Sequence, residues 1–408
     1  MLDLRYIREH TDEVRQSIRR RGMQVELDRW IKLDLRRSEL IPQVDELRSA
    51  LKLSGKPSPA ELADLQLAKH TLSKREAELK YIEDEWHDLL SDMPNRIDED
   101  TPDGGEEANR EERQGGTKPT GLESYKDHLE LNQALKFVDF ESGAKVAGSR
   151  FYYLRGRGLN LWRACVSVVA ELIEAEGFEM ISVPHMVNSR VAEGTGFLPR
   201  GEERQIYKVE DADLNLIATA ELPLTGLMMD EELVGPEPML LAGLSSCYRL
   251  EAGTYGKFAK GLYRVHQFEK LELYAFAAPE TSADLLQRIL GLEEKICQAL
   301  EIPYRVIRIA AGDLSAPAFH KYDVEYWSPS DNTWRELTSC SNCTDFQARR
   351  LNIRHRGADG QLGYAHTLNG TAITSTRTLI AILENHQTAD GQVKLPVALQ
   401  KYYGGEYL

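Results

Sequence analysis

Two long amphipathic segments near the N-terminus constrain the fold of this chain more than any other feature. In each, apolar residues recur three and four positions apart, the spacing that places them on one face of an α-helix. The first set is Trp30, Leu33, Leu40, Val44, Leu47 and Leu51, and the second is Leu65, Ala68, Leu72, Leu79, Ile82, Trp86 and Leu89. Between them, residues 53–59 contain Gly55, Pro57 and Pro59, which a continuous helix does not tolerate. The sequence therefore predicts an antiparallel two-helix coiled coil over residues 27–91, preceded by a short helix within residues 6–21.

This predicted arm differs in charge from the whole chain. Between residues 29 and 80 there are eleven Lys and Arg against eight Asp and Glu, whereas the 408-residue chain has a formal net charge of −15 at pH 7. An acidic chain is not a generally basic nucleic-acid binder, because phosphate neutralisation requires Lys and Arg at the contact surface. Any contact with RNA must therefore be local. A helical arm of this kind is also a common oligomerisation or spacer device.

A stretch rich in acidic residues, Gly and Pro follows the arm, and its composition indicates a solvated connector. We predict an N-terminal coiled-coil arm over residues 1–100, an acidic flexible linker over 101–122 and a catalytic domain over 123–408. Alternating apolar residues at 304–309 and 322–327 predict strands. The predicted fold class is α+β, with an antiparallel sheet in the larger domain.

The cysteines and the apolar runs indicate the compartment. Five cysteines form no small disulfide framework, so we expect a reducing environment. Cys340 and Cys343 form a C-x-x-C pair, but nothing in the sequence completes a tetrahedral zinc site, and buried thiols are the better interpretation. No apolar signal core follows Met1, and no run reaches the roughly 18 apolar residues of a membrane span. We expect a cytoplasmic protein without a membrane segment.

Residues 248–272 carry the densest set of candidate functional side chains. A strand, a Gly-rich turn and a returning strand would bring together Arg249, Glu251, Arg264, Phe268 and Glu272. A triphosphate that reacts at its α-phosphate needs guanidinium groups on its oxygens, an aromatic face under its base, and carboxylates for an amine or a metal ion. The competing interpretation is a sheet whose outer face carries an exposed Arg/Glu ladder.

Three further segments favour the functional interpretation. They are Thr219-Ala220-Glu221, the stretch 334–343 with Glu336 and Ser339, and the stretch 366–371 with Asn369 and Thr371, which leads through Arg377 into an apolar helix. With residues 248–272 they resemble, in order, the active-site segments of class II aminoacyl-tRNA synthetases, and specifically of the seryl-tRNA synthetases. The resemblance covers nearly the whole chain.

The resemblance implies a catalytic set of three arginines. Arg249 is expected to bridge the serine carboxylate and the α-phosphate of ATP, and Arg264 to hold the bent triphosphate tail. Phe268 is expected to stack on adenine, with Arg377 on the opposite side near the γ-phosphate. Lys260 departs from the arginine that many family members have in this loop, so the charge is kept and the bidentate fork is lost.

The resemblance also implies the remaining ATP-binding residues and the metal ligands. Glu251 is expected to hydrogen-bond the adenine amino group, and Val265 belongs to the same ATP-binding set. Glu336 and Ser339 are expected to bind Mg²⁺ between the phosphates. ATP and Mg²⁺ are therefore the expected substrate and cofactor.

Serine itself is expected in an adjoining pocket. The resemblance implies that Thr219 and Glu221 contact its α-amino group and that Glu272 with Thr371 takes its hydroxyl, assisted by Asn369. A buried site that hydrogen-bonds a hydroxyl rejects the analogue without it by up to roughly 10⁴–10⁵, because its polar groups are left unpaired. Alanine should therefore be excluded strongly, and threonine only by size.

The family's partners follow from the same resemblance. The arm is expected to contact the long variable arm of tRNA(Ser), although it is shorter than usual in the family, and the charging of tRNA(Sec) is left open. A helix over residues 159–176, a strand over 178–183 and Pro184 resemble the first motif of the class, which implies a homodimer. Their periodicity alone fits a monomer equally well.

Activation of an amino acid needs alignment and charge neutralisation but no general base, since the substrate carboxylate is already the nucleophile. His266 is therefore interpreted as structural. Two other functions compete: a synthetase-like enzyme that loads a carrier protein or makes a small metabolite, and a paralogue that has lost activity. The arm argues against the first, and the intact charged residues Arg249, Glu251, Glu272, Glu336 and Arg377 argue against the second.

Overall fold

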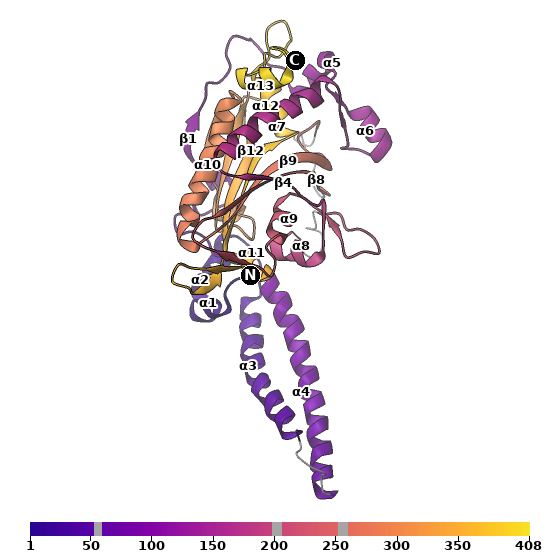
Figure 1. The fold of residues 1–408 in the computed structure, drawn as a ribbon, viewed down its shortest axis with the longest axis vertical. Helices are drawn as coiled ribbons and strands as arrows, with labels where there is room; N and C mark the ends of the chain where they lie inside the picture. The colour runs from indigo at the N-terminus through magenta and orange to yellow at the C-terminus, as the bar shows by residue number, and fades with distance from the viewer. Residues whose placement is uncertain (53–58, 198–205, 252–259) are drawn as a thin grey trace. The chain divides into compact units, whose positions relative to one another are not determined.

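The structure is a computed structural model that describes residues 1–52, 59–197, 206–251 and 260–408. The chain divides into two compact units, Met1–Pro94 and Asn95–Leu408 (Figure 1). The predicted turn between the arm helices lies, apart from Pro59, outside the described residues, and so does the Gly-rich turn at 252–259.

The described part of the first unit is built from helices. These are α1 (Leu4–Glu9), α2 (Thr11–Arg20), α3 (Leu27–Ala50) and α4 (Pro59–Ser91). Helices α3 and α4 form the predicted antiparallel pair. Ion pairs join the start of α3 to the end of α4, as in Arg29–Glu85, and the end of α3 to the middle of α4, as in Arg48–Glu76. The single short helix predicted within residues 6–21 is instead two helices with a break at His10.

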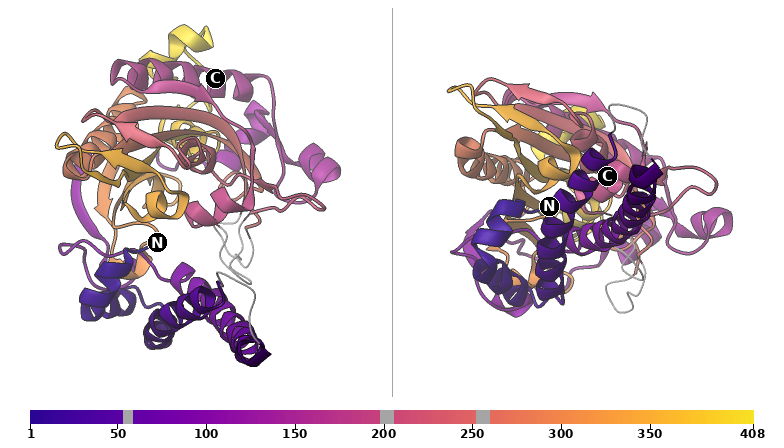
Figure 2. Two further views of the ribbon diagram at one scale, coloured as in Figure 1. Left: turned by 60° about the horizontal axis from the view of Figure 1, so that its bottom comes forward. Right: turned by 90° about the horizontal axis from the view of Figure 1, so that it is seen from below.

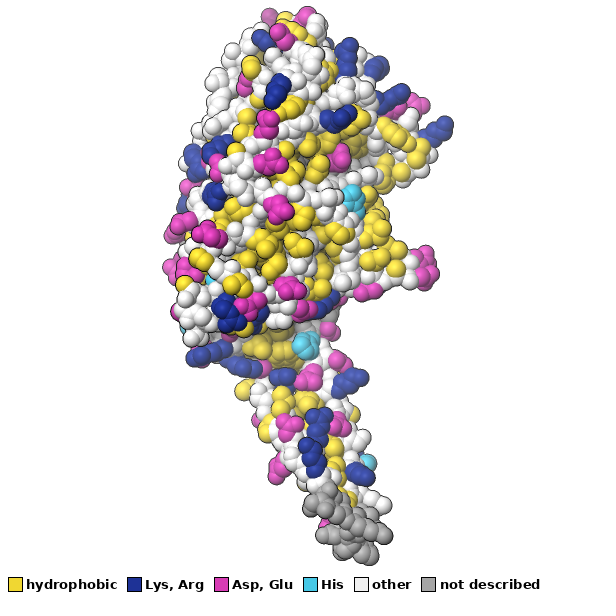
Figure 3. Space-filling model, in the orientation of Figure 1, with side chains coloured by type: hydrophobic (Ala, Val, Ile, Leu, Met, Phe, Trp, Pro, Cys, Tyr) yellow, Lys and Arg dark blue, Asp and Glu magenta, His cyan; other side chains and the backbone are white. Residues whose placement is uncertain are grey.

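Ion pairs between α3 and α4 use much of the basic surplus of the arm. They join Arg29 to Glu85, Arg37 to Glu83, Arg36 to Glu78 and Arg48 to Glu76. Along the arm, side chains of the two signs are accordingly interleaved (Figure 3). Solvent-exposed pairs of this kind contribute about 0–1 kcal/mol each, so their main effect is on register.

The base of the arm has a small aromatic core. Trp30 and Trp86 stack with ring centroids 5.7 Å apart, and the Trp86 indole donates to buried Asp34 at 3.1 Å. The Arg8 guanidinium donates to both Asp34 oxygens, at 2.7 and 2.8 Å. Although burial would raise the pKa of Asp34, these hydrogen bonds lower it below its usual value. The buried carboxylate is therefore fully compensated.

An eight-stranded sheet forms the centre of the second unit. Its order is β1 (Arg110–Gly115), β10 (Tyr304–Arg308), β11 (His320–Ser328), β12 (Thr333–Thr344), β15 (His366–Thr374), β9 (Gln267–Ala277), β8 (Met239–Tyr248) and β4 (Glu179–Ser182). Every neighbouring pair is antiparallel except β4 and β8. The predicted strands at 304–309 and 322–327 correspond to β10 and β11, and the predicted α+β class is confirmed.

Helices cover both faces of this curved sheet (Figure 2, left). On one face lie α7 (Arg157–Ala175), α10 (Ser282–Ala299), α12 (Arg377–Asn385) and α13 (Val397–Tyr403), and on the other lie α8 (Ser189–Thr195), α9 (Glu221–Gly226) and α11 (Phe346–Leu351). Strand β9 separates the two cores by alternation, with Leu271 and Leu273 in the first and Tyr274 and Phe276 in the second. Side chains at even positions of β9 therefore face α8 and α9.

The stretch predicted as a linker, residues 101–122, is part of the second unit and contains β1. The compact unit begins at Asn95, whose side-chain amide donates to the carbonyls of Pro317 and Cys343, both at 2.8 Å. Strand β1 pairs with β10 at the sheet edge, and five of its six side chains are exposed. A charged edge strand has no apolar alternation, which is why its composition suggested a connector.

The remaining elements are shorter. They are η1 (Glu106–Ala108), α5 (His128–Leu135), β2 (Val138–Asp139), α6 (Phe140–Ala147), β3 (Tyr153–Leu154), β5 (Met186–Val187), β6 (Asn215–Leu216), β7 (Glu232–Val234), η4 (Pro279–Thr281), η5 (Ala311–Asp313), β13 (Arg354–Arg356) and β14 (Leu362–Tyr364). Within the described ranges, no helix combines the length and the apolarity needed to cross a membrane.

Candidate active site

A polar cleft of about 280 Å³ lies over the face of the sheet formed by β9, β12 and β15. The candidate residues that line it are Arg249, Glu251, Arg264, Val265, Phe268, Glu336, Ser339, Thr371 and Arg377. They come from four separate segments of the chain. The structure thus brings together every side chain that the sequence assigned to ATP, together with Thr371, which it assigned to serine, and Arg249, which it assigned to both.

The pairing of β8 with β9 explains part of this convergence. Phe268, Lys270 and Glu272 alternate along β9 and so share the face that carries the cleft. Strand β8 ends at Tyr248, and the Arg249 amide still donates to the His266 carbonyl at 2.9 Å. Glu251 is no longer on the strand, because its φ of +46° turns the chain. Its carboxylate accepts from Arg264 at 2.8 Å.

A second ion pair joins Glu336 and Arg377 at 2.6 Å across β12 and the start of α12. Both side chains are partly exposed to the cleft. Desolvation there would raise the pKa of Glu336, but the positive charges of Arg377 and Lys321 lower it to about 2. Glu336 is therefore a carboxylate at physiological pH, available to a cation.

Arg249 is held beside the aromatic ring of the cleft. Its guanidinium lies 5.1 Å from the centroid of Phe268, and its Nε donates to the carbonyl of Ala218 at 3.3 Å. A guanidinium stacked on an aromatic face keeps its charge and has few rotamers to lose on binding an anion. His266 is tied into the same strand end, since its Nδ1 lies 2.9 Å from the Arg249 carbonyl.

The candidate serine residues form a buried polar cluster beside the cleft. Thr371 of β15 lies opposite Glu272 of β9 in the strand register. Glu272 accepts from the Thr219 hydroxyl at 3.1 Å and forms an ion pair with Lys270. Asn369 donates at 3.1 Å to Glu221, the first residue of α9. The five predicted serine residues other than Arg249 are thus brought together, four of them buried and Asn369 half-buried.

Glu221 is a buried carboxyl of this cluster whose pKa is shifted. Burial, reinforced by the negative charge of Glu272, raises the pKa of Glu221 to about 7. The Gln347 amide donates to it at 2.7 Å, while the Gln347 carbonyl accepts from Thr367 at 2.7 Å and from the Tyr274 hydroxyl at 3.1 Å. A cation placed next to Glu221 would favour its charged form.

Sequence reasoning missed Lys270 and Gln347. Lys270 had a detectable signal, because it lies between Phe268 and Glu272 at the period-two spacing of the strand. Gln347 had none, since it lies on the short helix α11 and reaches Glu221 only through the tertiary fold. Cys340 and Cys343 are buried free thiols, and no cluster of three or more His, Cys, Asp or Glu suited to a metal is found among the described residues.

The antiparallel sheet, with arginines, a charged glutamate and an aromatic ring converging on one face, is that of a class II aminoacyl-tRNA synthetase core. A family model described as the tRNA synthetase class II core domain (G, H, P, S and T) matches residues 207–386. A second model, the seryl-tRNA synthetase N-terminal domain, matches residues 1–97. The chain belongs to the seryl-tRNA synthetase family.

Similarity to individual relatives extends over the full length. The chain is 44% identical to a serine–tRNA ligase of Rubrobacter xylanophilus, over 100% of this chain and 99% of the relative. It is 42% identical to one of Dictyoglomus turgidum, over 99% and 98%. A crystal structure of seryl-tRNA synthetase from Pyrococcus horikoshii complexed with ATP superposes with a TM-score of 0.91 at 37% identity, over 100% of this chain and 99% of that one. A crystal structure of the cytoplasmic serine–tRNA ligase of Naegleria fowleri in complex with AMP superposes with a TM-score of 0.88 at 30% identity, over 100% of this chain and 98% of that one.

Proposed function

We propose that the cleft activates serine with ATP and that the chain then transfers the seryl group to tRNA(Ser), releasing AMP and pyrophosphate. The observation that carries this proposal is the convergence of three arginines, a charged glutamate and an aromatic ring next to the buried polar cluster that contains Thr219 and Glu272. The relatives named as serine–tRNA ligases, and the similar structures that contain ATP and AMP, support it.

The first step forms a bond between a serine carboxylate oxygen and the α-phosphorus as the bond from that phosphorus to pyrophosphate breaks. The nucleophile is already ionised, so the protein has to align it and offset charge. Arg249 is assigned to the α-phosphate and the serine carboxylate, and Arg264 and Arg377 to the leaving phosphates. Both pair with glutamates in the present structure. These partners hold the guanidinium groups in place until phosphate oxygens take them over.

Mg²⁺ fits the cleft by its donor set. Glu336 remains charged because nearby positive groups lower its pKa, and the Ser339 hydroxyl on the same strand also lines the cleft. A hard divalent ion prefers such oxygen ligands and usually takes its remaining ones from phosphates and water. Glu336 and Ser339 would hold the ion, which would neutralise charge on the phosphates.

The nucleoside and the amino acid are assigned to the two ends of the cleft. Phe268 would stack on adenine, Glu251 would accept from the adenine amino group, and Val265 would complete this end. At the other end, Thr219 and Glu221 would bind the serine ammonium. Glu272 and Thr371, paired across β9 and β15, would bind the hydroxyl, with Asn369 fixing Glu221.

We also propose a homodimer that works in the cytoplasm. A pocket of about 420 Å³ is lined by residues of α6, β3 and α7, among them the exposed Val146, Tyr153 and Leu159, and by residues 246 and 267–269 of β8 and β9. Exposed apolar side chains such as these three are a typical contact for a second copy of the chain. All five cysteines are buried free thiols, as in a reducing compartment. Light scattering would give the mass of a dimer, and a monomer at micromolar concentration would refute the assembly.

The transfer of labelled serine to tRNA tests the proposed function against its competitors. We expect ATP- and Mg²⁺-dependent formation of seryl-tRNA(Ser), with no labelling of a carrier protein. Labelling of a carrier in place of tRNA would favour the carrier-loading enzyme. If no amino acid is activated or transferred, the protein is an inactive paralogue.

A further inference from the structure

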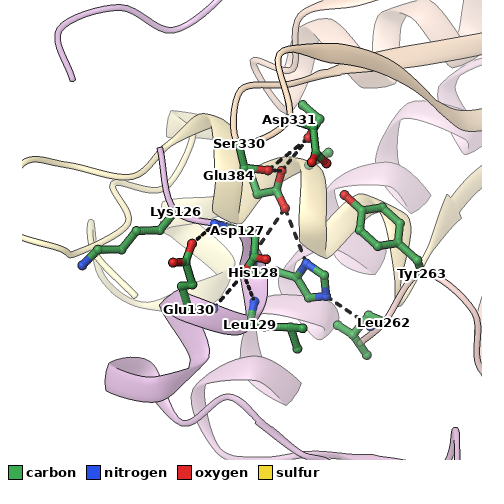
Figure 4. A network of polar contacts seen from close by, with 12 residues as sticks. Lys126, Asp127, His128, Leu129, Glu130, Leu262, Tyr263, Ser330, Asp331 and Glu384 are labelled. Atoms are coloured by element: carbon green, nitrogen blue, oxygen red, sulfur yellow. Dashed lines mark hydrogen bonds and ion pairs between the residues drawn. The ribbon is translucent and has the colours of Figure 1, made fainter. Parts of the chain in front are cut away.

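A buried polar network connects the ATP-binding segment to two distant parts of the second unit (Figure 4). Its centre is His128, the first residue of α5, whose side chain is 2% exposed. The ring lies between Leu262, which precedes the cleft residues, and Glu384 of α12, which is fully buried. Nothing in the proposed chemistry uses either His128 or Glu384.

The hydrogen bonds define the tautomer of His128. The Leu262 backbone amide donates to Nε2 at 3.2 Å. An amide N–H can only donate, so Nε2 carries no proton and the neutral ring is protonated at Nδ1. Nδ1 lies 3.5 Å from Glu384 Oε1 without making a hydrogen bond to it, and Oε1 instead accepts from the His128 backbone amide at 3.3 Å. The Ser328 and Ser330 hydroxyls both donate to Glu384 Oε2 at 2.9 Å, which fixes the carboxyl group that anchors the start of α5.

The ring is packed directly against the turn that leads into the cleft. Gly261 has a φ of +62°, and a Cβ at that position would lie 2.2 Å from His128 Nε2. The Tyr263 ring meets His128 edge to face, with centroids 5.2 Å apart, and its hydroxyl lies 3.0 Å from that of Tyr326. Tyr263 and Arg264, the next two residues after Leu262, both line the cleft.

We propose that His128, whose backbone amide is held by Glu384, is a positioning residue for ATP: by accepting a hydrogen bond from the Leu262 amide, its ring sets the backbone from which Tyr263 and Arg264 enter the cleft. This inference rests on the proposed function and deepens it. His128 itself does not touch the substrates. Its loss therefore displaces the groups assigned to the phosphates and leaves the serine cluster, built from β9, β15 and α9, in place.

Two variants of His128 test whether the hydrogen bond that its Nε2 accepts from the Leu262 amide is what matters. In His128→Gln the side-chain carbonyl can reach the position of Nε2, whereas His128→Phe keeps a ring and leaves the Leu262 amide buried without a partner. We expect the Phe variant to raise the KM for ATP about tenfold with the KM for serine changed less than about twofold, and the Gln variant to stay within about threefold of the parent for both. A KM for ATP that is equal in the two variants would overturn the proposal.

His355 provides the matched control. It is also a buried histidine bonded to the backbone, with Nε2 3.2 Å from the Gly235 carbonyl, but it lies in the small sheet of β7, β13 and β14. We expect His355→Phe to lower the melting temperature without changing the KM for ATP. If it raised that KM as His128→Phe does, the effect would be general destabilisation and the proposal would fail.

Two further measurements keep the outcomes distinct. Should His128→Phe not fold, His128→Asn replaces it, because its carbonyl ends short of the Nε2 position and should also raise the KM for ATP. Serine-dependent exchange of pyrophosphate with ATP, which reports the activation step, is measured for the parent protein in the same experiment. Its absence would sink the proposed function, whereas an active parent with unaffected His128 variants would sink the positioning role alone.

Discussion

The arm and the cleft contain the same kinds of side chain, yet they use them differently. In the arm, arginine and glutamate pair across two exposed helices, as Arg48 and Glu76 do with 55% and 41% of their side chains exposed. In the cleft, Arg377 and Glu336 pair with 31% and 43% of their side chains exposed, but Lys321 acts on the same carboxylate, and the positive charges of Arg377 and Lys321 lower the pKa of Glu336 to about 2. The isolated pairs of the arm fix register at small energetic gain, whereas the converging charges of the cleft are held ready for a ligand.

The largest predicted effect is on Arg249, the arginine assigned to the α-phosphate and the serine carboxylate. Arg249→Ala should lower serine-dependent ATP–pyrophosphate exchange by about 10³-fold or more, since it removes the charge on the transferring phosphate. Arg249→Lys is the control, because it keeps the charge and loses the fork, and it should retain measurable exchange. Near-normal turnover of the Ala variant would refute the role assigned to Arg249.

The second prediction separates the two regions. A chain of residues 95–408 should keep serine activation, because every assigned substrate residue lies in the second unit, and should charge tRNA(Ser) about 10²-fold less well than the intact chain. Charging by the intact protein should also fall with added salt, to a degree set by the number of phosphate contacts. Equal charging by both chains would show that the arm is a spacer or a dimer accessory.

The third prediction concerns the neutral polar contact assigned to serine. Thr371→Val keeps the shape of the side chain and removes its hydroxyl, so the preference for serine over alanine should narrow about tenfold while the KM for ATP stays unchanged. Exchange kinetics with both amino acids measure the ratio. An unchanged ratio would remove Thr371 from the pocket.

The fourth prediction uses pH to test the buried acid. Because burial raises the pKa of Glu221 to about 7, its charged form is lost as pH falls through 7, and with it the pairing to the serine ammonium. The KM for serine should therefore rise several-fold from pH 8 to pH 6. Glu221→Gln, which is neutral throughout, should have a flat profile over this range and a higher KM at pH 8. A flat profile in the parent protein would contradict the assignment.

The smallest effect is expected in the arm. Arg48→Ala removes an exposed pair and should change the free energy of unfolding by less than about 1 kcal/mol in urea titrations. Asp34→Ala is the informative contrast, because it leaves the Trp86 indole and Arg8 without their buried acceptor and should cost about 2–3 kcal/mol. Equal costs would mean that burial does not distinguish the two pairs.

Prediction from sequence succeeded where residues of one kind recur at a spacing that fits only one type of secondary structure. The spacing of Trp30, Leu40 and Val44 defined a helix face, and all three are buried. The alternation of Phe268 and Glu272 placed both on one face of β9. In each case the local pattern and the tertiary core agree.

It failed where the deciding contact is between distant residues. The charged strand β1 has no apolar period, and its pairing with β10 depends on chain some 190 residues away. Gln347 bonds Glu221 across 126 residues. Glu251 leaves the strand through a positive φ that its residue type does not announce. Such contacts depend on the topology of the fold, which cannot be predicted from the spacing of apolar residues or from composition.

The proposed function requires that the cleft activate serine, by hydrogen-bonding its hydroxyl, independently of the arm. Amino-acid-dependent ATP–pyrophosphate exchange in the absence of tRNA is the decisive measurement, with serine, alanine and threonine compared at equal concentration. We expect exchange with serine and at most a small fraction of that rate with alanine. Exchange at comparable rates with serine and alanine, or exchange that requires tRNA, would contradict it.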